Sequence, residues 1–452
     1  MKKREFLAMG GAVPLMMAGC GGSGSASVRL VNASVGYPSL GFQVESTQIV
    51  SDIAYGTASD FLTVQDGSVK TNLTTETSGV VTTMTTTTRT LAKSNRYSLV
   101  AYGVLGSPKA VLINENQDTP DTGYASFNVL NTSVDVGAVD VYLSGSGVDY
   151  TTTTPIATNI SGVATSAFQN ITPGSYIVTV VGTGTVAEGS PDVRYQGTVL
   201  ITLVNQKIYT LILSQGGGGV LTNTILLQQA SDGAVTGAAN TYSRLRVVVA
   251  TGNTTGGVGG TTNVLNVTGG AVSSPYIEDY VTIAAGAAPA VQYTPPGGSA
   301  QTISSATIGT LVAGYDYTML VYLTSDTVAA VALITDDNTL PVTSTNCKVR
   351  LINAVYDSSA TSLPLSLAVN STSMASNLAY AAASTYKEIA AASTTTVTVT
   401  SGFTTVLSYS GTNSLTTTVD GIYTMFVVGE GTPTTIAAGT SGVAGKFLAA
   451  NV

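Results

Sequence analysis

Few side chains in this 452-residue chain could carry out acid–base or nucleophilic chemistry. It has no histidine, which removes Ser–His and Cys–His nucleophile pairs, the commonest general base and most zinc, copper and iron sites. Carboxylates remain, and Asp121-Thr122-Gly123 matches the tripeptide in which two aspartates of aspartic proteases share one proton. No second Asp-Thr-Gly or Asp-Ser-Gly occurs, so we interpret this tripeptide as a linker turn.

Carboxylate and amide oxygens gather at two other points, and such oxygens are the ligands that calcium prefers. The weak calcium candidates are Asn114, Asn116, Asp118, Asp121, Asp336 and Asp337. The alternative is a pair of solvated turns, because the EF-hand spacing of glycine and terminal glutamate is not met. No other cofactor is predicted, and no catalytic residue is assigned.

Cys20 offers chemistry of another kind, because a thiol can accept a lipid. It closes the run Leu15-Met16-Met17-Ala18-Gly19-Cys20 behind Lys2-Lys3-Arg4 and a short apolar stretch. This arrangement resembles a bacterial lipoprotein signal peptide, with small residues at the cleavage point and Met17 where Leu is usual. The resemblance implies a signal peptide over 1–19, lipid on Cys20 and a flexible tether over 20–27.

The same region bears on export and location. The alternatives to a signal peptide are an ordinary apolar N-terminus with a chance cysteine and an uncleaved membrane anchor. The apolar stretch is, however, shorter than the ~20 residues that span a bilayer. Lys3-Arg4-Glu5-Phe6-Leu7 also resembles the twin-arginine export signal. Gly21, rather than Asp, follows Cys20, which by resemblance to other lipoproteins favours the outer membrane. Whether the protein faces the periplasm or the cell surface stays open.

Composition limits the partners. The formal net charge is −8, and charged residues make up only 9% of the chain, which argues against nucleic acid. Cys347, the other cysteine, opens an apolar run, and we expect a buried small side chain there.

The chain contains four copies of one sequence unit. The run Val28–Ser34 recurs at 127–133, 245–251 and 349–355, so Arg29, Asn128, Arg246 and Arg350 correspond. Each copy ends on a similar strand that begins at a tyrosine: Tyr97, Tyr209, Tyr317 and Tyr423. Short β-branched runs bounded by Gly, Asn, Asp and Pro predict strands, and several per unit predict one antiparallel β-sandwich, immunoglobulin-like or transthyretin-like, in each copy. The fold class is therefore all-β with tandem sandwiches.

Turn-rich spacers set the predicted domain limits. We expect β-sandwich repeats over 28–118, 124–232, 240–339 and 346–452, of which the third is divergent. If they stack end to end, the four repeats would extend on the order of 130 Å.

The repeats resemble the bacterial domain-of-unknown-function family 4397, whose units begin with a Val-Arg-Val-Val-Asn-Ala-Ser-like strand. The match is best in the first, second and fourth copies, and 53–61, 139–143 and 378–381 are similar to the family's middle strands. The resemblance implies an architecture and brings no known activity.

Three further motifs have structural interpretations. The run Gly216–Gly219 lacks the Lys-Ser or Lys-Thr of a phosphate loop and predicts a hairpin turn. The threonines of 82–88 predict a strand with outward hydroxyls, which sugars or neighbouring chains could contact. The four tyrosines are expected to bury their rings and to fix a turn through their hydroxyls, rather than to form a binding row.

These features favour a lipid-anchored cell-envelope protein with a non-enzymatic binding, adhesion or structural role. Its partners would be the membrane, through the lipid, and cell-surface glycans or proteins. Two alternatives stay open. One is a glycan-processing hydrolase that uses carboxylates alone, since glycosidases need only two. The other is a periplasm-facing envelope assembly factor.

Overall fold

The computed structural model describes residues 24–450, apart from 190, 234, 253–258, 358–362 and 432–442. The predicted signal peptide, Cys20 and the start of the tether lie outside the described residues. Within them the fold is nearly all-β and consists of tandem β-sandwiches, as predicted. The one α-helix is α1 (Ser305–Ile308), and none of the helices in the described part has the length and apolarity to span a bilayer.

The first repeat is two four-stranded sheets packed face to face. Its first sheet has the order β4-β1-β7-β8, comprising β4 (Leu62–Gln65), β1 (Ser25–Asn32), β7 (Arg96–Tyr102) and β8 (Lys109–Asn114). Its second sheet has the order β3-β2-β5-β6, comprising β3 (Thr47–Ala54), β2 (Ser39–Val44), β5 (Gly67–Thr77) and β6 (Val80–Leu91).

The second repeat follows the same plan with one added strand in each sheet. The first sheet comprises β12 (Gln169–Ile171), β9 (Ala125–Asn131), β16 (Ile208–Gln215), β17 (Thr222–Gln228) and β18 (Val235–Ala238). The second comprises β11 (Ala157–Ile160), β10 (Val139–Ser144), β13 (Gly174–Gly182) and β14 (Val193–Gln196), with β15 (Ile201–Leu203) also on β13.

In the third and fourth repeats, two short strands pair antiparallel with the first strand, where the first repeat has the single strand β4. The third has β22 (Tyr276–Ile277) and β23 (Val281–Ala284) on β19 (Tyr242–Ala250), then β28 (Asp316–Ser325) and β29 (Val328–Asp336). Its other strands are β21 (Val272–Ser273), β20 (Thr261–Val264), β25 (Val291–Thr294) and β26 (Gln301–Ile303), with the pair β24 (Gly286–Ala287) and β27 (Thr310–Leu311).

The fourth repeat has β33 (Ala382–Ala383) and β34 (Lys387–Ala390) on β30 (Asn346–Tyr356), then β37 (Ile422–Glu430) and β38 (Ala444–Ala449). Its second sheet comprises β32 (Thr372–Leu378), β31 (Leu365–Val369), β35 (Val397–Ser401) and β36 (Thr404–Tyr409).

Each repeat contains one parallel strand pair among its antiparallel ones. The first strand pairs in parallel with the strand that begins near the recurrent tyrosine, as β1 with β7, β9 with β16, β19 with β28 and β30 with β37. The register is the same in all four, since Arg29 pairs with Ser98 and Arg350 with Thr424. This ladder runs through the centre of each first sheet.

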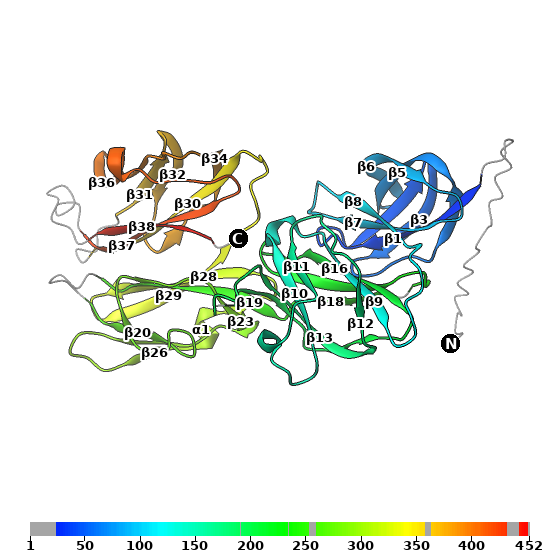
Figure 1. Ribbon diagram of the computed structural model, residues 1–452. Helices are drawn as coiled ribbons and strands as arrows, with labels where there is room; N and C mark the ends of the chain where they lie inside the picture. The colour runs from blue at the N-terminus through cyan, green and yellow to red at the C-terminus, as the bar shows by residue number, and fades with distance from the viewer. Residues whose placement is uncertain are drawn as a thin grey trace, which may run out of the picture.

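The repeats associate in pairs through the outer faces of their first sheets. Val31 and Val100 of the first repeat pack with Leu130 and Ile212 of the second in one buried cluster. The corresponding residues of the third and fourth repeats, Val248, Leu320, Ile352 and Phe426, form another. Figure 1 shows the first repeat (blue) beside the second and the fourth (orange) over the third.

The two repeats of each pair are therefore packed face to face and are not stacked end to end. Residues at corresponding positions of the parallel strand pair in the two repeats pack against each other, as in the self-complementary interface of a two-fold dimer. The reason is that the first strands are apolar on both faces: one face fills the repeat's own core and the other needs a cover.

Candidate binding site and the contacts that hold the scaffold

The four recurrent tyrosines each fix the turn before their strand. Their rings are buried, and each hydroxyl accepts a hydrogen bond from the backbone N–H five residues earlier. The donors are Ala92, Val204, Val312 and Thr418, at 2.9, 3.1, 3.0 and 2.8 Å from the oxygens of Tyr97, Tyr209, Tyr317 and Tyr423. The structural interpretation of these tyrosines is confirmed.

Arg29 joins the first repeat to the second. Its side chain is fully buried and donates to Glu115 Oε1 (Nη2, 2.7 Å) and to Ser98 Oγ (Nε, 2.7 Å). It also donates to the backbone oxygens of Gln228 and Ser231 in the second repeat. The second carboxylate oxygen of Glu115 accepts from the Ala230 N–H at 2.6 Å. Buried charges need such complete pairing, so this contact fixes how the two repeats meet.

The second repeat has an uncharged version of the same network. Thr210 Oγ1 donates to Asn128 at 2.7 Å and accepts from Gln229 Nε2 at 2.9 Å, and all three side chains are buried. Asn128 and Gln229 thus occupy the positions of Arg29 and Glu115 without their charges.

Asp336 accepts hydrogen bonds from side chains of both the third and the fourth repeat. It accepts from Arg350 Nη2 of the fourth repeat at 2.5 Å and from Thr318 of its own at 2.7 Å. The Tyr280 hydroxyl donates to it as well. Burial alone would lower the pKa of Arg350, but Asp336, together with Tyr386 and Tyr280, outweighs burial and the pKa is raised.

Arginines stacked on rings complete this junction. The guanidinium of Arg246 lies 4.1 Å from the Tyr280 ring centroid and 5.5 Å from that of Phe426 in the fourth repeat. Arg244 donates through Nε and Nη2 to both oxygens of Asp316, at 2.9 and 2.6 Å. Arg246 thus joins the third repeat to the fourth, and Arg244 also lies 3.9 Å from Asp192 of the second repeat. Both side chains are buried and are not exposed to a ligand.

Four of the calcium candidates are engaged in contacts with other protein groups. Asp336 faces Arg350, and Asp337 accepts from Lys348 Nζ at 2.8 Å. Asn114 and Asn116 accept from backbone N–H groups of the first repeat. The described residues contain no group of three or more Asp, Glu or Cys side chains able to hold a metal ion. Calcium at these junctions stays a prediction without support from this geometry.

Two other sequence motifs have structural roles. The Gly216–Gly219 run is the hairpin turn between β16 and β17, as predicted. It lies against the third repeat: Gly218 N donates to Gly314 O, and a Cβ on Gly217 would stand 2.4 Å from the Tyr315 ring. Asp121 is exposed just before β9, where its carbonyl accepts from Tyr124 N.

The sequence analysis missed the asparagine of the repeated first strand. Asn32 Nδ2 donates to the Tyr37 and Ile53 carbonyls, and its Oδ1 accepts from Ser34 N. Asn131 and Asn353 make the matching three bonds in the second and fourth repeats. The third repeat has Val249 there. The recurrence of this asparagine at the same position in three copies could have indicated its structural role.

An open groove lies at one side of the second repeat. It runs between β11 and β12, the edge strands of the two sheets, and has a volume of about 520 Å³, within the usual range of ligand sites. Ile156, Ile160 and Ile171 form its apolar part, while Thr158, Gln169 and Asn170 supply exposed polar groups. None of the lining side chains is charged. The groove therefore offers no titratable group.

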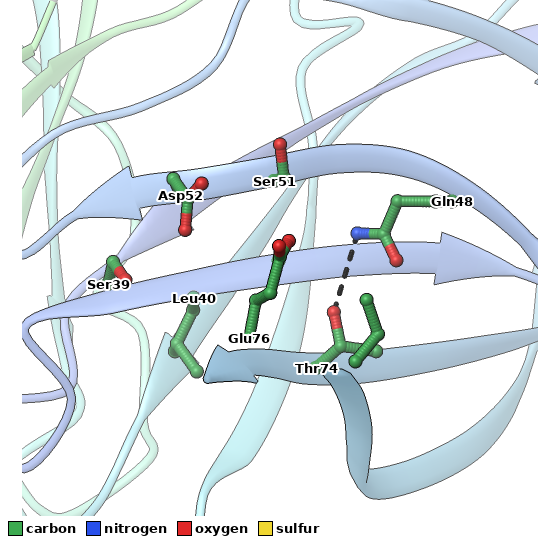
Figure 2. A pocket seen from close by; sticks show the side chains of 9 residues that line it. Ser39, Leu40, Gln48, Ser51, Asp52, Thr74 and Glu76 are labelled. Atoms are coloured by element: carbon green, nitrogen blue, oxygen red, sulfur yellow. Dashed lines mark hydrogen bonds between the residues drawn. The ribbon is translucent and has the colours of Figure 1, made fainter. Parts of the chain in front are cut away.

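A second depression lies on the outer face of the first repeat. Figure 2 shows Asp52 and Glu76 among the polar side chains that line it, with Gln48 donating to Thr74 at 3.4 Å. Gly41 lies beneath, where a Cβ would stand 2.5 Å from Thr74 Oγ1. The volume is about 10 Å³, room for about one water molecule. These carboxylates therefore lack a cleft for a sugar ring.

The threonines of 82–88 lie on β6, an exposed edge strand, as predicted. Cys347 is buried at the start of β30, also as predicted, and burial raises the pKa of its thiol.

Comparison with protein families finds a match in the first part of the chain. Residues 26–142 match the family described as domain of unknown function, DUF4397. These residues comprise the first repeat and the beginning of the second.

The solved structures that match are distant. One is a candidate cell adhesion protein from Bacteroides uniformis, with 13% identity and a TM-score of 0.20, covering 49% of this chain and all of its own. Another is the Bacillus anthracis TIE protein, with 11% identity and a TM-score of 0.14, covering 90% of this chain and 68% of its own. No curated protein matches.

Proposed function

We propose that this chain is a lipid-anchored cell-envelope protein whose β-sandwich repeats act as a non-enzymatic binding, adhesion or structural module. The observation that carries the proposal is the β11–β12 groove, which is large enough for a ligand and has no charged lining residue. Acid–base and nucleophilic catalysis need a titratable group or an activating base beside the substrate. Binding needs only shape, apolar contact and hydrogen bonds.

The scaffold supports the same role. Arg29, Arg244 and Arg350 are buried, and each contacts a neighbouring repeat. Such a rigid body, joined to a lipid anchor by a flexible tether, would present the groove away from the membrane. The Cys20 sequence motif is the support for the anchor.

Binding is tested with the non-lipidated mature chain, Cys20→Ser, applied to cells and to envelope fractions. Ala167→Trp fills the groove, and Ala187→Trp in the exposed β13–β14 loop of the same repeat is the matched control. We expect retention of the parent and of Ala187→Trp, and loss of retention for Ala167→Trp. Equal retention of the two tryptophan variants would remove the groove from the proposal.

The anchor is tested separately. In the producing cell, Cys20→Ser should move the protein from the membrane fraction to the soluble fraction with an unchanged melting temperature. Retention of this variant in membranes would count against lipid attachment. Protease treatment of intact cells then decides between a surface-exposed and a periplasmic module, because only a surface-exposed chain is cleaved.

A further inference from the structure

The β6 strand (Val80–Leu91) is a long and unguarded sheet edge. It has 12 residues, whereas the edge strands at the same place in the other repeats, β14, β26 and β36, have 4, 3 and 6. Within the described residues β6 pairs only with β5. Its backbone groups on the other side are thus available for a further strand.

The usual protections of an edge are weak here. Proteins shield edges with charged side chains, proline or bulges. Residues 80–88 contain neither a charge nor a proline. The one charged residue of β6, Arg89, turns inward: Nη2 donates to Ala110 O at 2.7 Å and Nε to Thr71 Oγ1 at 3.1 Å. A bulge interrupts the ladder between Leu73 and Thr74, but Thr85–Leu91 pairs with β5 regularly.

The regular part of β6 is complementary to itself. Its inward residues pair with Val69, Thr71 and Leu73, so the alternate residues Thr86, Thr88 and Thr90 stand on the outer face. An antiparallel pairing of two β6 strands about Thr88 sets Thr86 of each copy opposite Thr90 of the other. Cross-strand threonine pairs are favourable, and no like charges meet.

We propose that β6 is a self-association edge, at which a second copy of this chain pairs antiparallel with β6. The ladder β3-β2-β5-β6 then continues across the contact into the second copy's β6. This contact uses neither the β11–β12 groove nor the faces that join the repeats, so it is independent of the proposed binding function.

The test uses charge exchange at the paired threonines in the Cys20→Ser chain. Thr86→Lys with Thr90→Lys places like charges opposite each other, and sedimentation should show dimerisation weakened about tenfold or more. Thr86→Asp with Thr90→Asp should do the same. An equimolar mixture of the two variants should recover dimers, because each lysine then faces an aspartate.

The matched control puts the same charges on a shorter edge. Thr405→Lys with Ser408→Lys alters exposed positions of β36 in the fourth repeat and should leave dimerisation as in the parent. Hydrogen exchange gives a second measurement: protection of 80–91 should rise with protein concentration, and protection of 404–409 should not. Melting curves verify that each variant folds.

Three results would overturn the proposal. One is a parent chain that stays monomeric over the concentration series. Another is a Thr86→Lys, Thr90→Lys variant that dimerises as tightly as the parent. The third is a monomeric parent whose β6 becomes protected only when a foreign strand-forming peptide is added, which would assign the edge to a different partner.

Discussion

Arg350 of the fourth repeat forms its ion pair with Asp336, the residue that ends the third repeat (Nη2–Oδ1 2.5 Å). Arg29, at the corresponding position of the first repeat, pairs with Glu115 of its own repeat. In the fourth repeat Ala449 pairs with Tyr423, as Asn114 pairs with Tyr97 in the first repeat. The next residue, Ala450, therefore stands at the position of Glu115. The fourth repeat therefore depends on its neighbour for the counter-charge of a buried cation.

Replacing Asp336 should destabilise the pair of repeats strongly. Asp336→Ala leaves Arg350 buried without its carboxylate, and such a loss costs about 3–5 kcal/mol of unfolding free energy. Urea unfolding followed by fluorescence measures this change.

The neighbouring Asp337 provides the control. Its carboxylate is 59% exposed, so Asp337→Ala should cost about 1 kcal/mol or less. The double variant Asp336→Ala, Arg350→Met removes the orphaned charge and should recover part of the loss. Equal costs for the Asp336 and Asp337 variants would show that the shared pair does not stabilise the junction.

The tyrosine hydroxyls should make a smaller and separable contribution. Tyr317→Phe keeps the buried ring but leaves the Val312 N–H without its acceptor, a loss of about 1 kcal/mol. Tyr124→Phe is the control, because the Tyr124 side chain is 44% exposed to water. Thermal melting of the two variants should differ, and identical midpoints would contradict a role for the hydroxyl.

The sequence predicted strands, sandwiches and turn-fixing tyrosines because these depend on local pattern. It did not predict the pairing of repeats, although a signal was present. Val28 and Leu30 face the first repeat's core, and Val31 and Ala33 face the second repeat. A first strand that is apolar on both faces indicates burial on both sides.

The groove and the shared ion pair could not be predicted in this way. The groove is formed by β11 and β12, which belong to different sheets, so its existence depends on how the two edges diverge. Arg350 has several acidic candidates in the sequence, and only the packing of the third repeat on the fourth selects Asp336.

The glycine turn should be a steric requirement of the contact between the second and third repeats. Gly217→Ala places a methyl group about where the Tyr315 ring lies, and such overpacking costs about 1–3 kcal/mol. Gly270→Ala is the control, since a Cβ there meets nothing within 4 Å. Chemical unfolding should show a loss for the first variant only. A neutral Gly217→Ala would mean that the turn moves freely.

Asp135 should make this junction sensitive to pH. The carboxylate is buried, accepts from Leu340 N at 2.9 Å and receives a hydrogen bond from Gln215. Burial raises its pKa above the model-peptide value of 3.8, with the hydrogen bonds acting in the opposite direction. As pH rises above 3.8, the unfolded chain ionises Asp135 before the folded chain does, so the folded state loses stability through the raised pKa.

Asp135→Asn removes this ionisation while keeping an acceptor for Leu340. Its stability relative to the parent should therefore rise between pH 3.8 and the raised pKa of Asp135 in the folded chain, and stay constant below that window. Asp149→Asn should show the opposite slope, because the bond from Thr151 N lowers the pKa of Asp149. Paired urea titrations at several pH values measure both slopes. Parallel curves for Asp135→Asn and the parent would show that Asp135 ionises alike in the folded and unfolded chain.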